Sequence, residues 1–346
     1  MQRLDMNLRF QAAIRGEAQA TPPVWMMRQA GRYHRHYQAL RKQHGFMQLC
    51  KNPQLAAEVA LGPIEDFDFD VSILFSDLLF PLEALGMGLD YDAGPPRLAW
   101  SLDTKTIHHL LGPDEALAGL QFQQEAMRLT RAKLPKDKSL IGFVGGPWTL
   151  LGYAVDGSHQ GGLRRTRELA PELLSPFFEI LVPLLQQNIR LQLEGGAEAV
   201  LVLDTAAGEL DLDSWKSWVL PSLSRLVSAH PGKVGYYMRG ATQLHWDILH
   251  AANLPLAGIG FDAGIDLVAE LRGRTHGFVQ GNFFQEFMTL PEVEFMAKFE
   301  DWIAPLERLS PQQRRGWVCG VGHGLTPQAR EDNVRRFVKM IRERLI

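Results

Sequence analysis

The sequence predicts an α/β protein folded as a single (β/α)8 barrel, also called a TIM barrel. Short apolar runs alternate eight times with longer stretches of helical period, which favours a barrel over an open doubly wound sheet. The runs are continuous, as is typical of strands buried on both faces. No low-complexity tract or Pro/Ser linker divides the chain, so residues 1–346 are expected to form one domain.

Each of the eight apolar runs is interpreted as one strand of this barrel. The runs are Val24–Met27, Val71–Phe75, Leu140–Val144, Ala199–Leu203, Val234–Met238, Ala257–Phe261, Gly277–Val279 and Trp317–Cys319. A further segment, Arg97–Leu102, is either an outlying strand or part of an insertion. In such a barrel the active site lies at the C-terminal ends of the strands.

Several helices between the strands have recognisable ends. Asn52 before Pro53 predicts an N-cap and a first helical residue, and Thr326 before Pro327 predicts the same for the last helix. A long amphipathic stretch, Pro171–Gly196, precedes the fourth strand. One face of the last helix is basic and is expected to be solvated near the C-terminal end of the helix dipole, through Arg335, Arg336, Lys339, Arg342 and Arg344.

Composition excludes several classes of protein. The chain has 346 residues, is 46% hydrophobic and 22% charged, and can therefore bury a large core. It has no run of 18 apolar residues for a membrane span, and its first ten residues lack the apolar region of a secretory signal. A net charge of −3 argues against non-specific nucleic-acid binding. The only two cysteines, Cys50 and Cys319, exclude a disulfide scaffold and fit a reducing, cytoplasmic setting.

Polar and charged residues directly follow the predicted strands, which suggests a cleft at the strand ends. Loops are generally polar, but several of these residues are unlike ordinary turn residues. In chain order they are Arg28 and Arg32, Ser76 and Asp77, Gly145 to Pro147 with Tyr153, Asp204 and Thr205, Arg239 and Gly240, Asp262, Asn282 and His323.

The pair Arg28 and Arg32 is the sharpest of these features. At i and i+4 the two guanidiniums share a face if the loop begins a helix, and together they offer bidentate sites for carboxylates or phosphates. Gly31 between them permits close approach of the backbone. The alternative is that both form structural salt bridges.

Asp77 and His323 are the next candidates. Asp77 directly follows an apolar run, so its carboxylate either stabilises a cation or accepts N–H bonds in a site, or serves as a cap or arginine partner. His323 lies in a glycine loop, Gly320–Gly324, where we expect the glycines to let a ligand approach the backbone. A structural role for the histidine is the alternative.

Other motifs are weak. The glycine spacing at 320–324 is not that of a dinucleotide fingerprint, and there is neither a P-loop nor a nucleophile elbow. His34 and His36 lack the neighbouring ligands of a metal site, so no metal is expected. The alternating segment 66–70, with aspartates at 66, 68 and 70, is interpreted as a solvated face leading into the second strand.

The segment PVWMMRQAGRY at 23–33 closely resembles the amino-terminal signature of the uroporphyrinogen decarboxylase family. The segment ILFSDLL at 73–79, with Pro81 and the residues EALGM at 83–87, is similar to the aspartate loop of that family. Further similar segments are GFVGGPWT at 142–149 with Tyr153, LDTAAGEL at 203–210, QGN at 280–282 and GHG at 322–324. The resemblance covers nearly the whole chain in order.

This resemblance implies a (β/α)8 barrel without cofactor or metal, usually a homodimer. It further implies removal of the carboxyl groups from the four acetate side chains of uroporphyrinogen III, which gives coproporphyrinogen III in haem synthesis. Asp77, placed at the pyrrole N–H groups, would be catalytic together with Arg28 and Arg32. The substrate-binding residues would be Arg28, Gln29, Ala30, Gly31, Arg32, Asp77, Tyr153, Thr205 and His323.

The chemistry of the reaction agrees with these residue types. Loss of CO₂ from an acetate on a pyrrole leaves a carbanion unless the ring, protonated first at its α-carbon, accepts the electrons. An anion such as Asp77 would then stabilise the cationic ring, and Arg28 and Arg32 would hold the remaining carboxylates. Arginine is a poor acid, so the proton would come from a tyrosine, a histidine or a water held by one of them.

Three segments depart from the family pattern. His34-Arg35-His36 replaces a common Leu-Pro-Glu, Arg239 stands where lysine is frequent, and the segment NFFQ at 282–285 lacks the usual NLDP. The last two alter loops near the predicted mouth, where we favour an effect on packing over one on substrate preference.

Two other functions are alternatives. A corrinoid-dependent methyltransferase on the same barrel would need a His-x-Cys pair and a second cysteine for zinc, whereas Cys319 lies four residues before His323. A non-catalytic tetrapyrrole-binding protein is the other alternative, and the intact candidate residues argue against it.

Overall fold

The computed structural model describes residues 6–91, 94–158, 161–273 and 276–345. Two compact units alternate along the chain. Unit 1 comprises Met1–Phe75, Leu129–Ile141 and Ala257–Ile346, and unit 2 comprises Ser76–Arg128 and Gly142–Leu256. The boundary between Ile141 and Gly142 falls inside a strand, so one strand belongs to both units.

The described residues form seven strands of one sheet, and these follow one another in chain order. Parallel pairing joins β1 to β2, β3 to β4, β5 to β6 and β6 to β7. The strands are β1 (Val71–Ile73), β2 (Ser139–Gly145), β3 (Ala199–Leu203), β4 (Val234–Tyr237), β5 (Gly258–Gly260), β6 (Phe278–Phe283) and β7 (Trp317–Val321). Seven of the eight predicted strands are thus confirmed, with ends that shift by a few residues.

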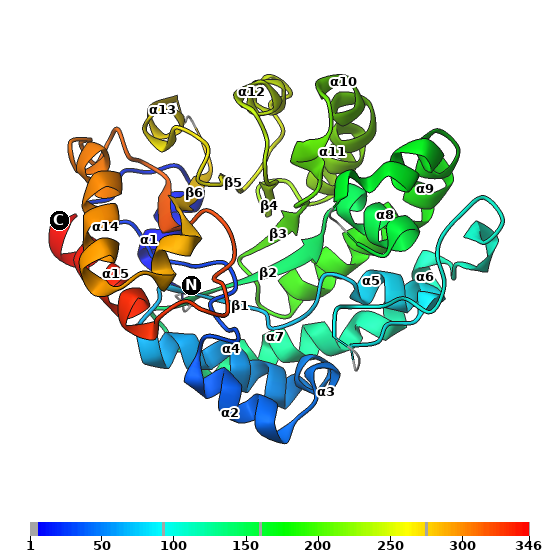
Figure 1. The fold of residues 1–346 in the computed structure, drawn as a ribbon, viewed down its shortest axis with the longest axis horizontal. Coiled ribbons are helices and arrows are strands. Elements are labelled where there is room, and N and C mark those ends of the chain that lie inside the picture. The colour runs from blue at the N-terminus through cyan, green and yellow to red at the C-terminus, as the bar shows by residue number, and fades with distance from the viewer. Residues whose placement is uncertain (1–5, 92–93, 159–160, 274–275, 346) are drawn as a thin grey trace, which may run out of the picture. The chain divides into compact units, whose positions relative to one another are not determined.

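Helices separate the strands along the chain (Figure 1). Unit 1 contains α1 (Leu8–Ile14), α2 (Arg35–Gln43), α3 (Phe46–Lys51), α4 (Pro53–Phe67), α13 (Leu267–Gly273), α14 (Glu292–Glu307) and α15 (Glu331–Arg344). Unit 2 contains α5 (Phe80–Leu82), α6 (Pro113–Ala116), α8 (Pro147–Asp156), α9 (Arg164–Glu194), α10 (Leu212–Ser214), α11 (Leu220–Ala229) and α12 (Gln243–Ala251). Helix α7 (Gln121–Lys133) contributes to both.

The predicted strand Val24–Met27 is wrong as a regular strand, because only Val24 makes a parallel bridge, to Cys319 in β7. The Val24 carbonyl accepts the N–H of Asp70 just before β1, at 3.0 Å. The Val24 N–H donates to the Asp70 side chain instead of to a strand, at 2.8 Å. Pro23, immediately before it, has no N–H to donate, and Met27 and Arg28 already form a turn. The Asp70 side chain and Pro23 thus interrupt the regular hydrogen bonding of a strand.

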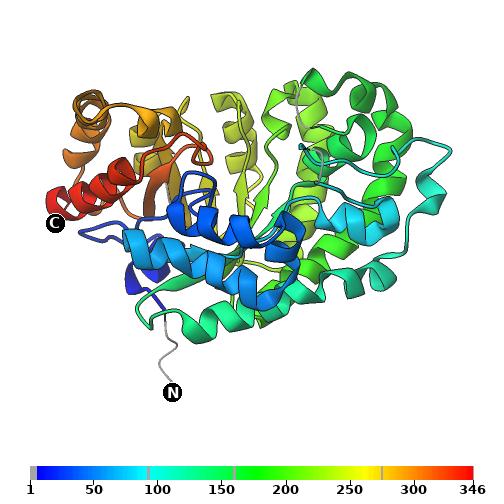
Figure 2. The ribbon, with the colours of Figure 1, turned by 60° about the horizontal axis from the view of Figure 1, so that its bottom comes forward.

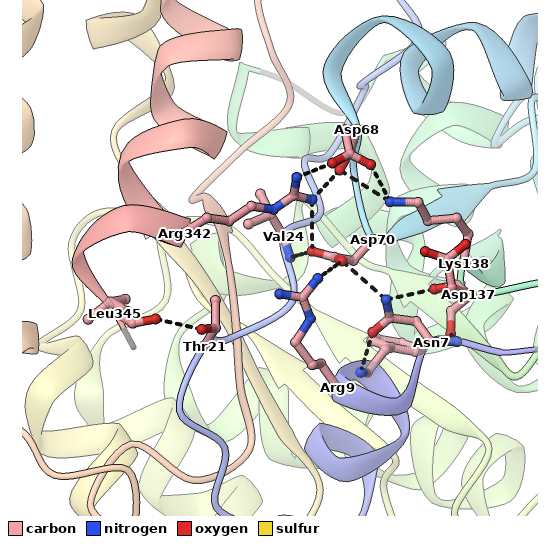
Figure 3. A network of polar contacts seen from close by, with 12 residues as sticks. Asn7, Arg9, Thr21, Val24, Asp68, Asp70, Asp137, Lys138, Arg342 and Leu345 are labelled. Carbon is pink, nitrogen blue, oxygen red and sulfur yellow. Dashed lines mark hydrogen bonds and ion pairs between the residues drawn. The ribbon is translucent and has the colours of Figure 1, made fainter. Parts of the chain in front are cut away.

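The predicted solvated face of the segment 66–70 is confirmed for Asp66 and Asp68, which are exposed, and is wrong for Asp70. Asp70 is fully buried and binds Asn7, Arg9 and the N–H of Val24, as Figure 3 shows. Asp68 ends α4 in the left-handed conformation and pairs with Lys138 and Arg342. Two phenylalanines of the segment are buried as well. Alternation alone does not reveal that cations from distant segments converge on these carboxylates.

Of the two predicted helix starts, the one at Asn52 is confirmed and the one at Thr326 is wrong. Asn52 caps α4, since its side chain accepts the N–H of Leu55 at 3.0 Å. The last helix begins at Glu331 and not at Pro327, because Pro327 lies in a turn and Arg330 is the N-cap. Its basic face is paired and not simply solvated, through ion pairs of Arg335 with Glu331 and Asp332, Arg336 with Glu292, Arg342 with Asp68, and Arg344 with Glu300 and Glu307.

The predicted amphipathic stretch Pro171–Gly196 lies in α9, which packs along α8 (Figure 1). The helix begins seven residues earlier than Pro171, at Arg164. The carboxylate of Asp156 accepts the N–H of Thr166 at 3.0 Å and caps its first turn. Arg97–Leu102 makes only one antiparallel bridge, between Asp90 and Arg97, and is otherwise irregular.

In unit 1, aromatic side chains form the core between β6, α14 and α15. The ring of Phe283 lies 5.3 Å from both Trp302 and Phe337, centroid to centroid, and 6.2 Å from Phe299. Helices α2 and α4 of the same unit pack on one another, as Figure 2 shows. In unit 2 the largest buried side chains include Trp148, Trp215 and Trp246. No helix of the described residues is both long enough and apolar enough to cross a lipid bilayer.

Candidate active site

The candidate residues of unit 1 begin with the loop after Val24. Arg28 has a backbone φ of +58°, a left-handed conformation that is unusual for a residue with a side chain. Arg28 and Arg32 are both exposed, and both lie in turns that precede α2. The expected helix face is therefore absent from the loop, and its turns position the two guanidiniums. Backbone strain of this kind clusters at functional sites.

Gln29 anchors this loop to the sheet. Its side chain is buried, and Nε2 donates to the Val71 carbonyl of β1 at 3.1 Å. The buried hydroxyl of Tyr33 donates to the Gln29 carbonyl at 2.7 Å. Ala30 and Gly31 are half-buried and lie between these anchors. Each exposed arginine is therefore followed directly by an anchored residue, Arg28 by Gln29 and Arg32 by Tyr33.

The glycine loop after β7 lies against the arginine loop. A Cβ on Gly324 would lie 2.3 Å from Cδ of Arg28, so the arginine side chain passes over this glycine. The N–H of Leu325 donates to the Met27 carbonyl at 2.9 Å. His323, which directly precedes Gly324, is half-buried in this loop.

We expected the glycines of this loop to let a ligand approach the backbone, but they accommodate the protein's own atoms. A Cβ on Gly320 would meet the Trp25 carbonyl oxygen at 1.9 Å, and one on Gly322 would meet the Ala263 nitrogen at 2.6 Å. Close packing at the strand ends therefore requires glycine at 320 and 322. The third glycine, Gly324, makes room for the Arg28 side chain.

The departures from the family pattern in unit 1 are explained by packing. His34 is buried, and its Nε2 lies 2.6 Å from a carboxylate oxygen of Asp66. Burial lowers the pKa of His34, although Asp66 opposes this effect. Phe283 is the centre of the aromatic core. Among the described residues, no group of three or more His, Cys, Asp or Glu side chains is placed to hold a metal ion.

The candidate residues of unit 2 include Asp77, shortly after β1. Asp77 is half-buried, and its Oδ1 accepts the N–H of Leu79 at 2.8 Å, which fixes the turn. A Cβ on Gly145 would lie 3.1 Å from the Leu78 carbonyl oxygen. The aspartate turn therefore lies against the end of β2.

Tyr153 and Thr205 are connected through two residues that the sequence analysis did not assign to the site. Asp204 ends β3, and its Oδ1 accepts the N–H of Thr149 at 2.8 Å and the Thr149 hydroxyl at 2.7 Å. Thr149 lies one turn before Tyr153 in α8. Thr205, directly after Asp204, is half-buried.

Burial raises the pKa of the Asp204 carboxyl to about 6, against the opposing hydrogen bonds from Thr149 and the Trp148 peptide. The sequence held a signal for this carboxyl. Helix α8 has glycine at its N-cap and proline next, so its free N–H groups need an acceptor from elsewhere in the chain. An aspartate at the end of a neighbouring buried strand is a suitable acceptor.

Nearly the whole chain matches one known protein family. The family model described as Uroporphyrinogen decarboxylase (URO-D) matches residues 5–344. This chain belongs to the uroporphyrinogen decarboxylase family. Curated proteins named uroporphyrinogen decarboxylase agree. One from Jannaschia sp. is 33% identical over 342 residues, covering 95% of this chain and 97% of its own, and one from Brucella melitensis is 32% identical, covering 97% and 99%.

Solved structures similar to this member of the uroporphyrinogen decarboxylase family show the same fold. A methyltransferase from Methanosarcina mazei aligns with a TM-score of 0.72 and 19% identity, covering 97% of each chain. A putative vitamin-B12 independent methionine synthase from Listeria monocytogenes aligns with a TM-score of 0.55 and 12% identity, covering 94% of this chain and 98% of its own. At these identities the likeness concerns the fold alone.

Proposed function

We propose that this protein removes the carboxyl groups of the four acetate side chains of uroporphyrinogen III and releases coproporphyrinogen III in haem synthesis. The observation that carries this proposal is the family match over residues 5–344. The relatives from Jannaschia sp. and Brucella melitensis are matched over 97% and 99% of their own length, which supports the proposal.

In this proposal the exposed arginines bind the acid side chains. Arg28 and Arg32 offer two guanidinium forks, which suit bidentate binding of carboxylates. Gln29 holds their loop on β1, and Ala30 and Gly31 provide backbone close to the substrate. Tyr153, Thr205 and His323 complete the substrate contacts, as the family resemblance implies.

Asp77 is proposed to stabilise the reacting pyrrole. Protonation of a ring α-carbon makes the pyrrole an iminium-like cation, and its N–H groups then donate to the Asp77 carboxylate. The bond between the acetate methylene and its carboxylate breaks, the electron pair neutralises the cation, and CO₂ leaves. Protonation of the resulting exocyclic methylene gives the methyl group, and loss of the proton first added to the ring α-carbon restores the neutral pyrrole.

The proton donor is proposed to be Tyr153, His323 or a water held by one of them, since arginine holds its proton too strongly. Tyr153→Phe and His323→Gln variants identify it. Loss of the donor lowers kcat and removes one limb of its pH profile, whereas loss of a binding contact raises KM and leaves the profile in place.

We further propose that residues 1–346 form one (β/α)8 barrel domain, with the Val24 segment in the place of its eighth strand. The neighbours of Val24 bond to Cys319 of β7 on one side, and the Val24 carbonyl accepts the Asp70 N–H before β1 on the other, which supports this assignment. A homodimer is proposed from the family resemblance alone, and a cytoplasmic setting from the small number of cysteines, Cys50 and Cys319, both of which are buried. Sedimentation of the purified protein tests the dimer.

An anaerobic assay tests the proposed function. Purified protein is incubated with freshly reduced uroporphyrinogen III, without added metal or cofactor, and the products are oxidised and separated by carboxyl count. We expect stepwise loss of carboxyl groups ending at coproporphyrinogen. Recovery of unchanged substrate with a folded protein would overturn the proposal.

A further inference from the structure

The first turn of α8 is capped by a residue from another part of the chain. The N-cap of α8 is Gly146, which has no side chain to accept the helix's free N–H groups. Asp204 at the end of β3 supplies the acceptor, through Oδ1 to the Thr149 N–H at 2.8 Å. A Cβ on Gly146 would lie 2.2 Å from Cβ and Cγ of Asp204. Glycine at this position therefore makes room for the carboxyl group.

The same carboxyl group, together with Thr149, fixes the backbone on both sides of Thr205. The Thr149 hydroxyl donates to Oδ1 of Asp204 at 2.7 Å and accepts the N–H of Ala206 at 3.0 Å. Thr149 thus binds the residues on both sides of Thr205, which fixes the backbone that presents the Thr205 side chain. Tyr153 follows Thr149 by four residues in α8 and so lies on the same face of that helix.

Stability alone is a weak reason for this arrangement. Asp204 is fully buried, its Oδ2 has no hydrogen-bond partner among the described residues, and burial of an ionisable carboxyl is unfavourable. A costly buried group is typically retained where it supports a site.

From this geometry we propose that Asp204, acting through Thr149, is a positioning residue that sets Thr205 and Tyr153 in the orientation that binds the tetrapyrrole. The inference rests on the proposed function, because it takes Thr205 and Tyr153 as substrate contacts. It adds two residues to the site, neither of which needs to touch the substrate.

Four variants test this role. Asp204→Ala and Thr149→Val remove the connection, whereas Asp204→Asn keeps an oxygen that can accept both bonds. The matched control is Thr166→Val, because Thr166 binds Asp156 through its N–H and hydroxyl at the first turn of α9 in the same way. No proposed substrate contact lies on α9.

We expect Asp204→Ala to raise KM for uroporphyrinogen at least tenfold with kcat changed less than threefold, and Thr149→Val to raise KM at least threefold. Asp204→Asn and Thr166→Val should stay within threefold of the unaltered protein. A purely structural role predicts a lower kcat from fewer folded molecules and an unchanged KM. That result, or an equal rise of KM in Thr166→Val, would overturn the proposal. If Asp204→Ala does not fold, Thr149→Val decides.

Hydrogen exchange separates this inference from the proposed function. Without substrate, the amides of Thr149 and Ala206 should exchange at least tenfold faster in Asp204→Ala than in Asp204→Asn. If the unaltered protein leaves uroporphyrinogen unchanged, the proposed function fails, and the exchange rates alone decide whether Asp204 orders these two segments. Equal exchange in the two variants would overturn the positioning role.

Discussion

The side chain of Arg28 passes directly over Gly324, so that a Cβ on this glycine would lie 2.3 Å from Cδ of the arginine. Arg28 itself has a left-handed backbone, with φ at +58°. Two features thus determine where the Arg28 guanidinium lies: the strained backbone of Arg28, and Gly324, whose lack of a side chain leaves room for it. Each feature yields a test.

The strained backbone of Arg28 predicts a trade-off between stability and activity. Both Arg28→Ala and Arg28→Gly remove the guanidinium, so both should raise KM for uroporphyrinogen or abolish turnover. Glycine tolerates positive φ, so Arg28→Gly should unfold with a free energy about 1 kcal/mol higher than Arg28→Ala. Urea denaturation of the two variants measures this difference, and equal stabilities would show that the left-handed conformation is not strained.

Gly324→Ala should impair activity while leaving the fold intact. The added methyl group displaces the middle of the flexible Arg28 side chain, so unfolding should change by less than about 1 kcal/mol. Misplacement of a binding group by about 1 Å can lower the rate about 100-fold. Gly45→Ala is the control, because no atom lies within 4 Å of a Cβ built there. A fully active Gly324→Ala would remove Arg28 from the site.

Asp77→Asn tests the charge of the proposed catalytic carboxylate. Asparagine retains an oxygen that can accept the Leu79 N–H, so the turn should persist. Loss of the negative charge should lower kcat by about 10²- to 10³-fold, as is typical when a group that stabilises a charged transition state is removed. Steady-state kinetics give kcat, and circular dichroism checks the fold. An unchanged kcat would rule out a cationic pyrrole stabilised by Asp77.

Asp70→Ala should destabilise the protein strongly. Substitution leaves Arg9, Asn7 and the Val24 N–H without the buried carboxylate that they share. Loss of one partner from a buried ionic group costs about 3–5 kcal/mol. Asp332→Ala, which removes an exposed partner of Arg335, should cost less than about 0.5 kcal/mol. Chemical denaturation compares the two, and similar small losses would contradict the assigned structural role of Asp70.

The buried carboxyl of Asp204 predicts a pH-dependent stability. Its pKa is raised from 3.8 to about 6, mainly by burial, so the folded state binds the proton more tightly than the unfolded state. This contribution to stability is fully present below pH 3.8 and is lost as the pH rises through about 6. The shift of about two pKa units corresponds to about 3 kcal/mol over the whole window.

Asp204→Asn cannot ionise and should lack this contribution. The unfolding free energy of the variant should therefore rise relative to that of the unaltered protein between pH 5 and pH 7, because only the unaltered protein loses stability over this range. Denaturation series at several pH values measure both proteins. Parallel pH profiles would show that Asp204 is not protonated in the folded state at pH 5.

Much of the fold followed from local patterns in the sequence. Continuous apolar runs located β1 to β7, because strands buried on both faces exclude polar residues. Val24–Met27 failed as a strand because a distant side chain, that of Asp70, takes the Val24 N–H. For the same reason alternation wrongly predicted a solvated Asp70, whose buried carboxylate binds Asn7 and Arg9, which are remote in sequence.

By itself, the sequence determined the family and the residue types of the site, since segments such as 23–33 and 73–79 are long and contiguous. The tertiary structure alone decided how those residues are held: Arg28 strained over Gly324, and Thr205 enclosed by Asp204 and Thr149. The physical reason is the separation along the sequence of the groups that interact. Side-chain chemistry and hydrophobic period are encoded locally, whereas hydrogen bonds and close contacts between strand ends exist only after segments more than 50 residues apart have packed together.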